Sequence, residues 1–328
     1  MLADRRAGLV IFLAACVAVA FGPPAIAQVN YPSRQVTIIV PLPAGGAADI
    51  LARGVAEKLQ FYTGKAFLVE NITGGGTIVA AERVARAPAD GYTLLVATST
   101  TLSSNPQFYH HLPYKIGDFE PISLLSANEF VLHIRKTLPA SDFSGLISYA
   151  KKSRGGLTYS TMGRGSNSEV LGELMKATFK IQMHDIPYRG APAALLDVIK
   201  GEIDLHFDNI TSTIPHIGDG KTKMIATTGE HRSPLLPEVP TLAELGYPNM
   251  ITGNIFAMLA PHGTPRPIVD RLNGLVRRAL AEPDLVQRWT AQGAPPRATT
   301  PEGLAQAMAR DNAFFEKNVH DLNLRPID

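Results

Sequence analysis

The chain has 328 residues, of which 45% are hydrophobic and 18% charged, with a formal net charge of +2. These proportions are ordinary for a globular protein and argue against disorder, and the length suffices for two compact lobes or one large α/β unit. Lys and Arg are scattered rather than clustered, so the sequence gives little support to nucleic-acid binding.

The first 27 residues have the order of parts that is typical of a secretory signal peptide. Two arginines precede the apolar run 9–21, which ends at two prolines and a small-residue site, 25–27. We predict a signal peptide over 1–27 with cleavage after Ala27, because the run is short for a membrane span. The alternative is a lipoprotein anchor at Cys16. Because this cysteine is the only one, the favoured cleavage leaves a mature chain without disulfides.

Residues 35–53, QVTIIVPLPAGGAADILAR, predict a strand, a glycine turn and a helix in succession. Val36–Val40 is a β-branched run of the kind buried in parallel sheets, and the prolines after it cannot donate to a ladder. Gly45 and Gly46 allow a tight turn before a helix over Ala48–Tyr62. The first N–H groups of such a helix point outward and favour an anion.

Strands and helices alternate through the first third of the chain. We predict a strand at Phe67–Glu70, a helix at Thr77–Ala87, a strand at Tyr92–Thr98 and a polar turn at Ser99–Asn105. This alternation indicates βαβ units and a parallel sheet. A long extended stretch, Pro121–Arg135, then predicts a strand that crosses between two lobes.

The alternation restarts in a mid-chain block. The predicted elements are a helix at Phe143–Lys152, a strand at Leu157–Ser160, a helix at Ser168–Phe179, a short strand at Ile186, a helix at Pro192–Lys200, a strand at Ile203–Phe207, a short helix near Thr213–Ile217 and a strand at Lys223–Thr227. A second extended stretch, Ile251–Ala260, precedes the final helices, the last at Pro301–Asn318. Two extended crossings around one block predict a discontinuous first lobe, 28–128 with 229–328, and a second lobe, 129–228.

Several predicted strand-to-helix turns are rich in Gly, Ser, Thr or Asn. They are Pro43–Ala47, Gly74–Thr77, Thr98–Ser104, Met162–Ser168 and Asp208–Thr213. Each can be an ordinary tight turn. In open α/β sheets, however, such turns lie at the carboxyl ends of strands, where ligands bind. Two lobes that face each other with these turns would enclose a cleft of N–H and hydroxyl donors, which suits a carboxylate without a fixed positive charge.

Two acidic positions have competing interpretations. Asp49 lies in the first turn of its predicted helix, where it caps N–H groups; the alternative is a contact with an amine or hydroxyl of a ligand. Asp204, His206 and Asp208 share one face of a predicted strand. Same-face neighbours lie about 7 Å apart, which is long for a shared metal, so we expect Asp208 alone near a ligand.

The glycine turns lack the motifs of the common enzyme classes. Gly163–Ser166 is not Gly-x-Ser-x-Gly, Gly74–Gly76 lacks the dinucleotide fingerprint, and the nine histidines include no His-Glu-x-x-His spacing. We therefore expect no catalytic residue, metal or cofactor.

Taken in order, these segments resemble the Bug family, the substrate-binding proteins of tripartite tricarboxylate transporters. The matching text is VPLPAGGAADILAR, VENITGGGTIVAAERVARAPADGYTLLVAT, the turn Tyr159–Ser168, IPYRGAPAALLDVIKGEIDLHFDN and EVPTLAELG. The resemblance implies a monomeric, type II-like periplasmic binding protein whose two α/β lobes, each a mainly parallel sheet with flanking helices, are joined by two crossing strands. It would close over a small organic carboxylate and deliver it to a membrane permease of the tripartite tricarboxylate type.

The resemblance also implies which residues bind the ligand through main-chain groups and bridging waters. These are two facing loops, Pro43, Ala44, Gly45 and Gly46 in one lobe and Gly163, Gly165, Ser166, Asn167 and Ser168 in the other, with Asp49, Thr98, Ser99, Tyr188, Gly190 and Asp208 as further candidates. Two departures stand out. Family members commonly have His where this chain has Glu169, and often an aromatic residue near Ile255. A Glu169 that faced the cleft would disfavour a second carboxylate there.

Two other functions fit the same sequence. The receptor could present its ligand to a signalling partner instead of a permease. A secreted hydrolase with a Ser-Thr-Asp cleft is the second alternative, although no catalytic triad can be assembled from the sequence.

Overall fold

The structure is a computed structural model that describes residues 30–163, 165–215, 220–250 and 252–324. The predicted signal peptide lies outside the described residues. Chain contacts separate two units, Met1–Tyr31 and Pro32–Asp328. All the elements below belong to the second unit.

The described residues form one mixed sheet with helices packed on it. Nine strands have the order β2-β1-β3-β9-β4-β7-β5-β6, with β8 paired to β4. The strands are β1 (Val36–Val40), β2 (Phe67–Asn71), β3 (Thr93–Thr98), β4 (Phe119–Arg135), β5 (Leu157–Thr161), β6 (Met183–Pro187), β7 (Leu205–Asn209), β8 (Thr222–Thr227) and β9 (Gly253–Pro261). The helices are α2 (Ala47–Thr63), α3 (Ile78–Ala85), α4 (Asn105–Phe108), α5 (Phe143–Lys152), α6 (Asn167–Phe179), α7 (Ala191–Lys200), α8 (Ile210–Thr213), α9 (Arg266–Leu280), α10 (Pro283–Ala291) and α11 (Pro301–Asp321).

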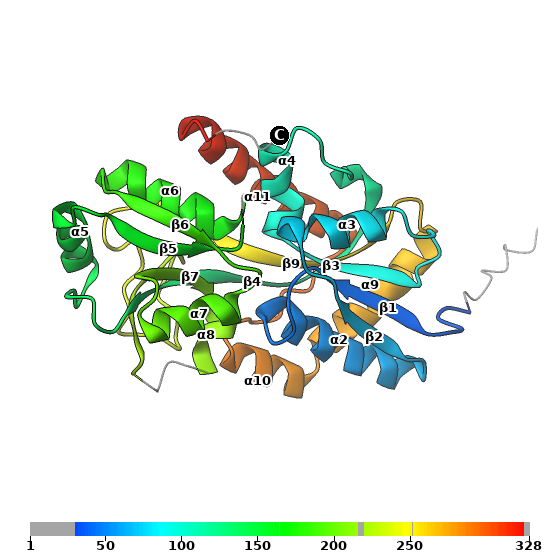
Figure 1. Ribbon diagram of the computed structural model, residues 1–328. Coiled ribbons are helices and arrows are strands. Elements are labelled where there is room, and N and C mark those ends of the chain that lie inside the picture. Colours follow the sequence, from blue (N-terminus) through cyan, green and yellow to red (C-terminus); the bar gives the residue numbers. More distant parts are fainter. Residues whose placement is uncertain (1–29, 164, 216–219, 251, 325–328) are drawn as a thin grey trace, which may run out of the picture. The chain divides into compact units, whose positions relative to one another are not determined.

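Strand β4 connects two halves of this sheet. Its residues 119–129 pair with β9, whereas 130–135 pair with β7 and β8. We call β1, β2, β3 and β9 with their helices the first half, and β5, β6, β7 and β8 with theirs the second half (Figure 1). Strands β1–β3 are parallel in one half and β5–β7 in the other. The predicted α/β class is confirmed. The sheet is less parallel than predicted, because every pairing of β4 and β9 is antiparallel.

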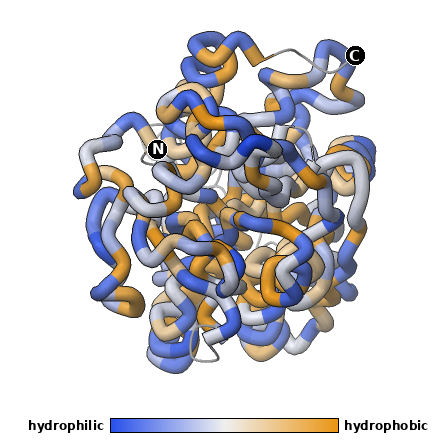
Figure 2. The backbone as a smooth tube through the Cα atoms, turned by 60° about the vertical axis from the view of Figure 1, so that its left-hand side comes forward, coloured by the Kyte–Doolittle hydropathy of each residue, from blue (hydrophilic) through white to orange (hydrophobic). Residues whose placement is uncertain are grey.

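Each half has its own apolar core. In the first half, β1, β3 and β9 contribute buried residues such as Ile39, Leu95 and Leu259. In the second half, Tyr159 and Phe207 lie among the residues of α5 and α6. The helices alternate between hydrophobic and hydrophilic residues along their length, as helices with one buried face do (Figure 2).

Helix α11 contacts both cores. Leu304, near its beginning, is fully buried in the first core, and Phe315, three turns later, is fully buried in the second. The helix also packs against β4 and against α6. It therefore joins the two halves at a place distinct from the crossing strand.

The segment after β8 packs on the second half. Thr227 forms a bridge with Thr241, and Leu242 and Met250 are fully buried in the second core. Strand β9 then pairs only with β3 and β4. This packing favours a return crossing near Thr252 over the predicted resumption of the first lobe at 229, and the lobe boundaries stay a prediction.

Two local predictions differ from the structure. The turn predicted at Ser99–Asn105 is helical, with a π-helical turn at Thr100–Ser104 that leads into α4. Its carbonyls have partners from outside: the Tyr114 hydroxyl donates to Thr101 O at 2.7 Å. The short helix predicted near Thr213–Ile217 begins earlier, at Ile210, and residues 216–217 lie outside the described residues.

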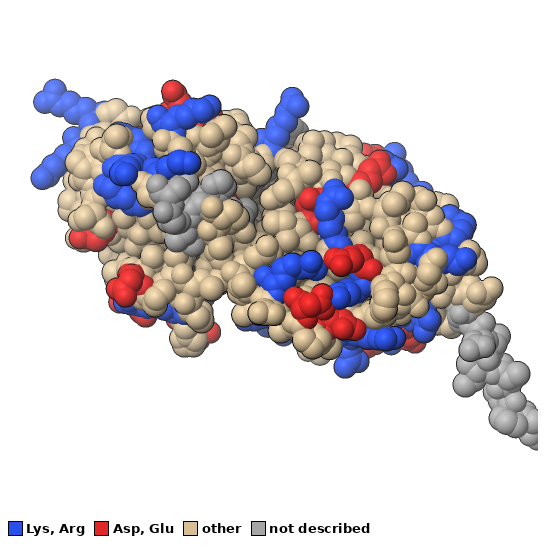
Figure 3. Space-filling view, turned by 90° about the horizontal axis from the view of Figure 1, so that it is seen from below, with Lys and Arg blue, Asp and Glu red and all other residues tan. Residues whose placement is uncertain are grey.

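Charged side chains of both signs are mixed on the surface, in agreement with the scattered Lys and Arg residues of the sequence. On the face seen in Figure 3, acidic and basic side chains lie interspersed over the region of α2 and α10. There Lys58 contacts Asp284 at 2.7 Å and Arg288 contacts Glu57 at 3.4 Å. This face thus carries paired charges that join two helices and has no field of a single sign in that region.

Candidate ligand-binding site

A cavity of about 290 Å³ lies between the two halves, at the carboxyl ends of the parallel strands. Its lining comprises Pro41–Pro43, Gly46 and Ala47 after β1, Gly74–Thr77 after β2, Thr98 and Thr100 at β3, Met162, Gly163 and Ser166–Ser168 after β5, Pro187–Pro192 after β6, Phe207–Asn209 of β7, and Phe130, Asn254 and Phe256 from β4 and β9. Parallel strands place ligand sites at this edge, and the size suits a small molecule.

Ten of the fifteen predicted site residues line this cavity. They are Pro43, Gly46, Thr98, Gly163, Ser166, Asn167, Ser168, Tyr188, Gly190 and Asp208. The other five, Ala44, Gly45, Asp49, Ser99 and Gly165, are outside the lining. Turns that are more than a hundred residues apart in the sequence come together at the cavity. Local contacts account for four of the five exceptions, all but Ala44.

Asp49 is occupied by its own half. Its carboxylate accepts hydrogen bonds from Gly45 N at 3.0 Å, from Arg53 Nε at 2.9 Å and from Asn71 Nδ2 at 3.0 Å. Burial raises the pKa of Asp49, but these hydrogen bonds outweigh it and hold the pKa below the ordinary value. The structural interpretation of Asp49 is thereby supported: it ties the glycine turn to the start of α2.

Glu169 ties a glycine turn to the start of a helix in the second half. It is the third residue of α6, only 4% exposed, and its carboxylate accepts a hydrogen bond from Gly165 N. The Ser166 hydroxyl caps the helix by accepting from Glu169 N at 3.3 Å. Glu169 therefore turns back into its own turn and is absent from the cavity lining. Ile255 is also absent from the lining and packs on the first core.

These two contacts change which amides are open to a ligand. Gly45 and Gly165 have φ angles of +82° and +76°, and both N–H groups donate to carboxylates of the protein itself. That these two residues lie at the ligand stays a prediction, and their N–H groups already have partners within the protein. Ser99 is turned away as well, since its hydroxyl accepts from Ile255 N at 3.0 Å.

The N–H groups at the starts of α2 and α6 are main-chain donors beside the cavity. Gly46, the residue before α2, makes no side-chain cap, and Ala47 follows it in the cavity lining. Asn167 and Ser168 are the first two residues of α6 and also line the cavity. With 17 and 13 residues, both helices are long enough to direct a positive dipole end at the cavity.

The two halves touch on both sides of the cavity. Gly190 lies so close to Pro43 that a Cβ on it would be 2.5 Å from the ring Cγ. On the other side Thr100 Oγ1 donates to Asn167 Oδ1 at 3.2 Å, and the Ser104 hydroxyl donates to Gly165 O. The two halves are thus in direct contact beside the cavity.

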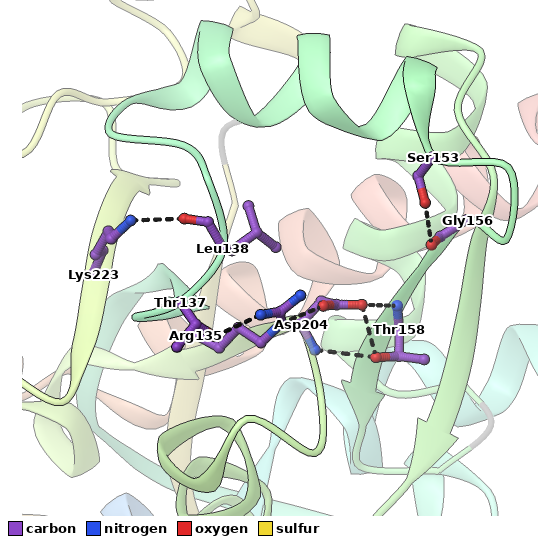
Figure 4. Close-up of polar contacts among 8 residues, drawn as sticks. All are labelled: Arg135, Thr137, Leu138, Ser153, Gly156, Thr158, Asp204 and Lys223. Carbon is purple, nitrogen blue, oxygen red and sulfur yellow. Dashed lines mark hydrogen bonds and ion pairs between the residues drawn. The ribbon is translucent and has the colours of Figure 1, made fainter.

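Asp208 is the one member of its strand triplet at the cavity. Asp204 lies at the opposite end of the strand region, where it accepts from Arg135 Nε at 2.6 Å and from Thr158 N at 2.8 Å (Figure 4). His206 is fully buried between them. Within the described part of the chain, no group of three His, Cys, Asp or Glu could hold a metal ion.

Ser160, His206 and Asp208 form a chain that resembles a catalytic triad in composition. The Ser160 hydroxyl lies 2.5 Å from His206 Nδ1, and His206 Nε2 lies 3.4 Å from Asp208 Oδ2. The order is reversed, however: the carboxylate lines the cavity, whereas Ser160 is fully buried and outside the lining. The serine could not reach a ligand, so the arrangement is unsuited to nucleophilic catalysis.

Sequence reasoning missed several lining residues. Arg189 stands inside the Pro-Tyr-Arg-Gly motif, between two residues that were selected, so its position could have been inferred. Asn254 and Phe256 come from β9, and no local signal links them to turns more than 150 residues earlier. Asn254 Oδ1 accepts from Ser99 N at 3.0 Å, which anchors the end of β3 beside the cavity.

The fold and the cavity define this chain as a solute-binding protein of the periplasmic type. The profile of the tripartite tricarboxylate transporter family receptors, TctC, matches residues 51–323, and the chain belongs to this family. It is 33% identical to the protein BugT of Bordetella pertussis (strain Tohama I), with 83% of this chain and 84% of BugT covered.

Solved structures agree with this assignment. The chain is similar to an R. palustris protein solved with adipate, with 32% identity, a TM-score of 0.87, and 90% and 100% of the two chains covered. It is also similar to MatC from Rhodopseudomonas palustris with bound malate, with 33% identity, a TM-score of 0.84, and 88% and 100% covered. Among the described residues no helix is long and apolar enough to cross a membrane.

Proposed function

We propose that this protein is a periplasmic receptor that closes over a small organic carboxylate and delivers it to a permease of the tripartite tricarboxylate type. The observation that carries the proposal is the cavity itself, which brings together helix starts and hydroxyl groups from both halves. The similar proteins solved with adipate and malate support a carboxylate as the ligand.

The ligand carboxylate would lie between the starts of α2 and α6. Ala47 on one side, and Asn167 and Ser168 on the other, would donate N–H groups to its oxygens, with the Thr98 hydroxyl nearby. Gly46 N donates to Pro43 O at 3.4 Å within its own turn. Hydrogen bonds to an ionised acceptor are short and strong, and two helix dipoles add to them. No positively charged side chain is required at this end of the ligand.

Closure of the two halves over the ligand would produce the binding affinity. Donors from a single half supply only part of the site, so the ligand contacts the closed form better than the open one and shifts the population towards it. The contacts of Pro43 with Gly190 and of Thr100 with Asn167 join the two halves, so opening of the halves would break them. A permease could recognise a surface that exists in this form alone.

The same cavity argues for binding rather than catalysis. The chain of Ser160, His206 and Asp208 reaches the cavity through its aspartate, and its serine is buried. We therefore propose a receptor without enzymatic activity, exported by the signal peptide predicted over 1–27 and acting as a monomer.

Calorimetry on the mature chain tests this proposal. Residues 28–328, stripped of bound ligand by unfolding and refolding, are titrated with a panel of mono- and dicarboxylates, and at least one acid should bind with a stoichiometry near one. Thr98→Val removes a lining hydroxyl without a change of shape and should weaken that binding about tenfold, since hydrogen bonds to charged groups contribute about 1.5–3 kcal/mol. Thr93→Val, at the other end of β3, is the control. If no acid in a broad panel gives heat or a thermal shift, the proposal fails.

A further inference from the structure

Asn254 is a buried polar residue at the beginning of β9, in the wall of the cavity. It is only 6% exposed, and it shares a face of the strand with Phe256, which also lines the cavity. Strand β9 lies between β3 and β4, the strand that connects the two halves. Asn254 therefore brings an amide group to the part of the wall that is next to the connecting strand.

The amide of Asn254 is held in one orientation by Ser99. Ser99 N donates to Asn254 Oδ1 at 3.0 Å, and the Ser99 hydroxyl accepts from Ile255 N at 3.0 Å. A backbone N–H can only donate, so its partner is the amide oxygen and the NH₂ group faces away from Ser99. Within the described part of the chain the Asn254 side chain makes no other hydrogen bond, and its nitrogen is not among the enclosed polar atoms that lack a partner. The N–H donors of this amide are therefore open to the cavity.

The start of α6 lies beside this amide. Asn167, the first residue of α6, donates through Nδ2 to Gly253 O at 3.3 Å, and its Oδ1 accepts from Thr100 Oγ1 at 3.2 Å. Gly253 directly precedes Asn254, and Thr100 directly follows Ser99. Both ends of the Asn167 amide are thus occupied by the first half, whereas the Asn254 amide uses its oxygen alone.

An oxygen of the ligand would satisfy the NH₂ group of Asn254. A buried amide donor without an acceptor costs free energy, and a hydrogen bond to a carboxylate is stronger than one to a neutral oxygen. The proposed place of the ligand carboxylate, between the starts of α2 and α6, is also where the contacts of Asn167 put this amide. A side-chain donor from β9 would therefore add to the main-chain donors of the two helices.

We propose that Asn254 is a ligand-binding residue: its Nδ2 donates to an oxygen of the ligand carboxylate, beside the N–H groups that start α2 and α6. This rests on the proposed function and deepens it. Because the donor is neutral and contacts the carboxylate only, it increases the affinity for every acid by a similar factor, whatever the rest of the ligand is.

Asn254→Asp separates the ligand contact from the structural one. The aspartate keeps the shape and still accepts from Ser99 N, but it presents a carboxylate oxygen in place of the NH₂ group. Calorimetry on the mature chain at pH 8, well above the ordinary pKa of an aspartate, should show binding about a hundredfold or more weaker than that of wild type. The probes are butyrate, hexanoate, succinate and adipate, together with the tightest acid of the calorimetric panel.

Asn254→Leu removes the donor and the acceptor of Ser99 N without a new charge. It should bind the same acids about tenfold more weakly than wild type, so its loss should be smaller than that of Asn254→Asp. Asn128→Asp is the matched control, because Asn128 pairs with Asn254 across β4 and β9, is 4% exposed and lies outside the lining. Its affinities should stay within about twofold of wild type.

Thermal unfolding shows whether each variant is folded. A crystal structure of the wild-type complex answers the same question without a variant, since Asn254 Nδ2 should lie about 3 Å from a carboxylate oxygen of the ligand. A ligand carboxylate that is out of reach of this nitrogen overturns the proposal.

The order of the two variants distinguishes the possible roles of Asn254. If Asn254→Asp binds as tightly as wild type, or more tightly than Asn254→Leu, the residue only anchors the end of β3, and the receptor function still stands. A loss that differs more than about tenfold between acids with different chains would put the contact elsewhere on the ligand and overturn its assignment to the carboxylate. If wild type binds no acid of the panel, both proposals are contradicted.

Discussion

The carboxylate of Glu169 accepts a hydrogen bond from the backbone N–H of Gly165, four residues before it. Asp49 makes the equivalent contact with Gly45 in the other half, also across four residues. In both cases an acidic residue in the first turn of a helix holds the glycine turn that precedes it. The two halves thus build their facing loops in the same way, and the first N–H groups of each helix remain next to the cavity.

Loss of the Asp49 carboxylate should destabilise the first half. Asp49→Asn keeps the shape but weakens the contacts with Gly45 and Arg53, and we expect the free energy of unfolding to fall by about 1–3 kcal/mol in urea titrations. Asp90→Asn is a control, because its ion pair with Arg34 is largely exposed. An unchanged unfolding midpoint for Asp49→Asn would show that the turn does not depend on this carboxylate.

The stabilisation by Asp49 should also depend on pH. Its pKa is depressed in the folded protein, so its contribution is present above the unfolded value of 3.8 and is lost as the pH falls through the lower folded value. The difference in stability between wild type and Asp49→Asn should therefore be constant from pH 5 upward and should shrink in more acidic solution. A difference that grows on acidification contradicts the assigned direction.

The contact between Gly190 and Pro43 should control closure. A methyl group at position 190 would come within 2.7 Å of two ring carbons of Pro43, so Gly190→Ala should keep the halves apart and weaken ligand binding about tenfold or more. Gly190 has an extended backbone, with φ of 175°, so alanine brings no backbone strain there.

A double variant separates this clash from other effects. Pro43→Ala removes the two ring carbons that the methyl group would meet, so the combination with Gly190→Ala should bind more tightly than Gly190→Ala alone. Calorimetry of the four proteins gives the coupling. Additive losses would mean that the two residues do not meet in the ligand-bound form.

Asp311 of α11 should make the stability rise on mild acidification. Burial beside the turn Thr100–Ser104 raises the pKa of Asp311 to about 6, although the hydroxyls of Ser103 and Ser99 oppose the shift. A raised folded pKa means that the ionised carboxyl costs stability above pH 6, and this cost disappears as the pH falls towards the unfolded value of 3.8. The full effect is about 3 kcal/mol at most.

Asp311→Asn isolates this effect. Wild type should gain stability between pH 7 and pH 5 relative to the variant, measured as the change in unfolding free energy. Asp321→Asn, on the exposed end of the same helix, should follow wild type over this range, since the pKa of Asp321 is lowered by the Lys317 hydrogen bond. If the unfolding free energy of wild type falls relative to that of the variant between pH 7 and pH 5, the Asp311 carboxyl has partners that favour its ionised form.

Helix α11 should contribute to the stability of both halves. Phe315 is fully buried in the second core, so Phe315→Ala should cost about 3–5 kcal/mol. Phe314 is its partly buried neighbour, and Phe314→Ala should lower the free energy of unfolding clearly less. Equal and small losses at both positions, measured by urea unfolding, would show that the end of this helix is not packed as the structure has it.

The sequence was a good guide to elements and a poorer one to side chains. Helix α5 begins and ends at the predicted residues. Its beginning is fixed by Asp142, with Gly145 N donating to Oδ1 at 2.7 Å. The turn Thr100–Ser104 was misjudged because its polar residues signal a loop, whereas buried partners such as Tyr114 and Asn105 make it helical.

The site shows the same contrast. Glycine turns at strand ends could be identified from local patterns, and they do line the cavity. The directions of the Asp49 and Glu169 carboxylates could not be identified from such patterns. Whether each carboxylate faces the cavity or its own glycine turn depends on a few ångströms of packing. Asn254 was out of reach for another reason: it meets Ser99 only through the pairing of β9 with β3.

A crystal structure of the mature protein with the tightest acid from the calorimetric panel gives the most direct test. The account predicts one ligand carboxylate with its oxygens about 3 Å, directly or through one water, from the N–H groups that start α2 at Ala47 and α6 at Ser168. A ligand bound outside the cavity, or a carboxylate held by one half alone, would contradict it.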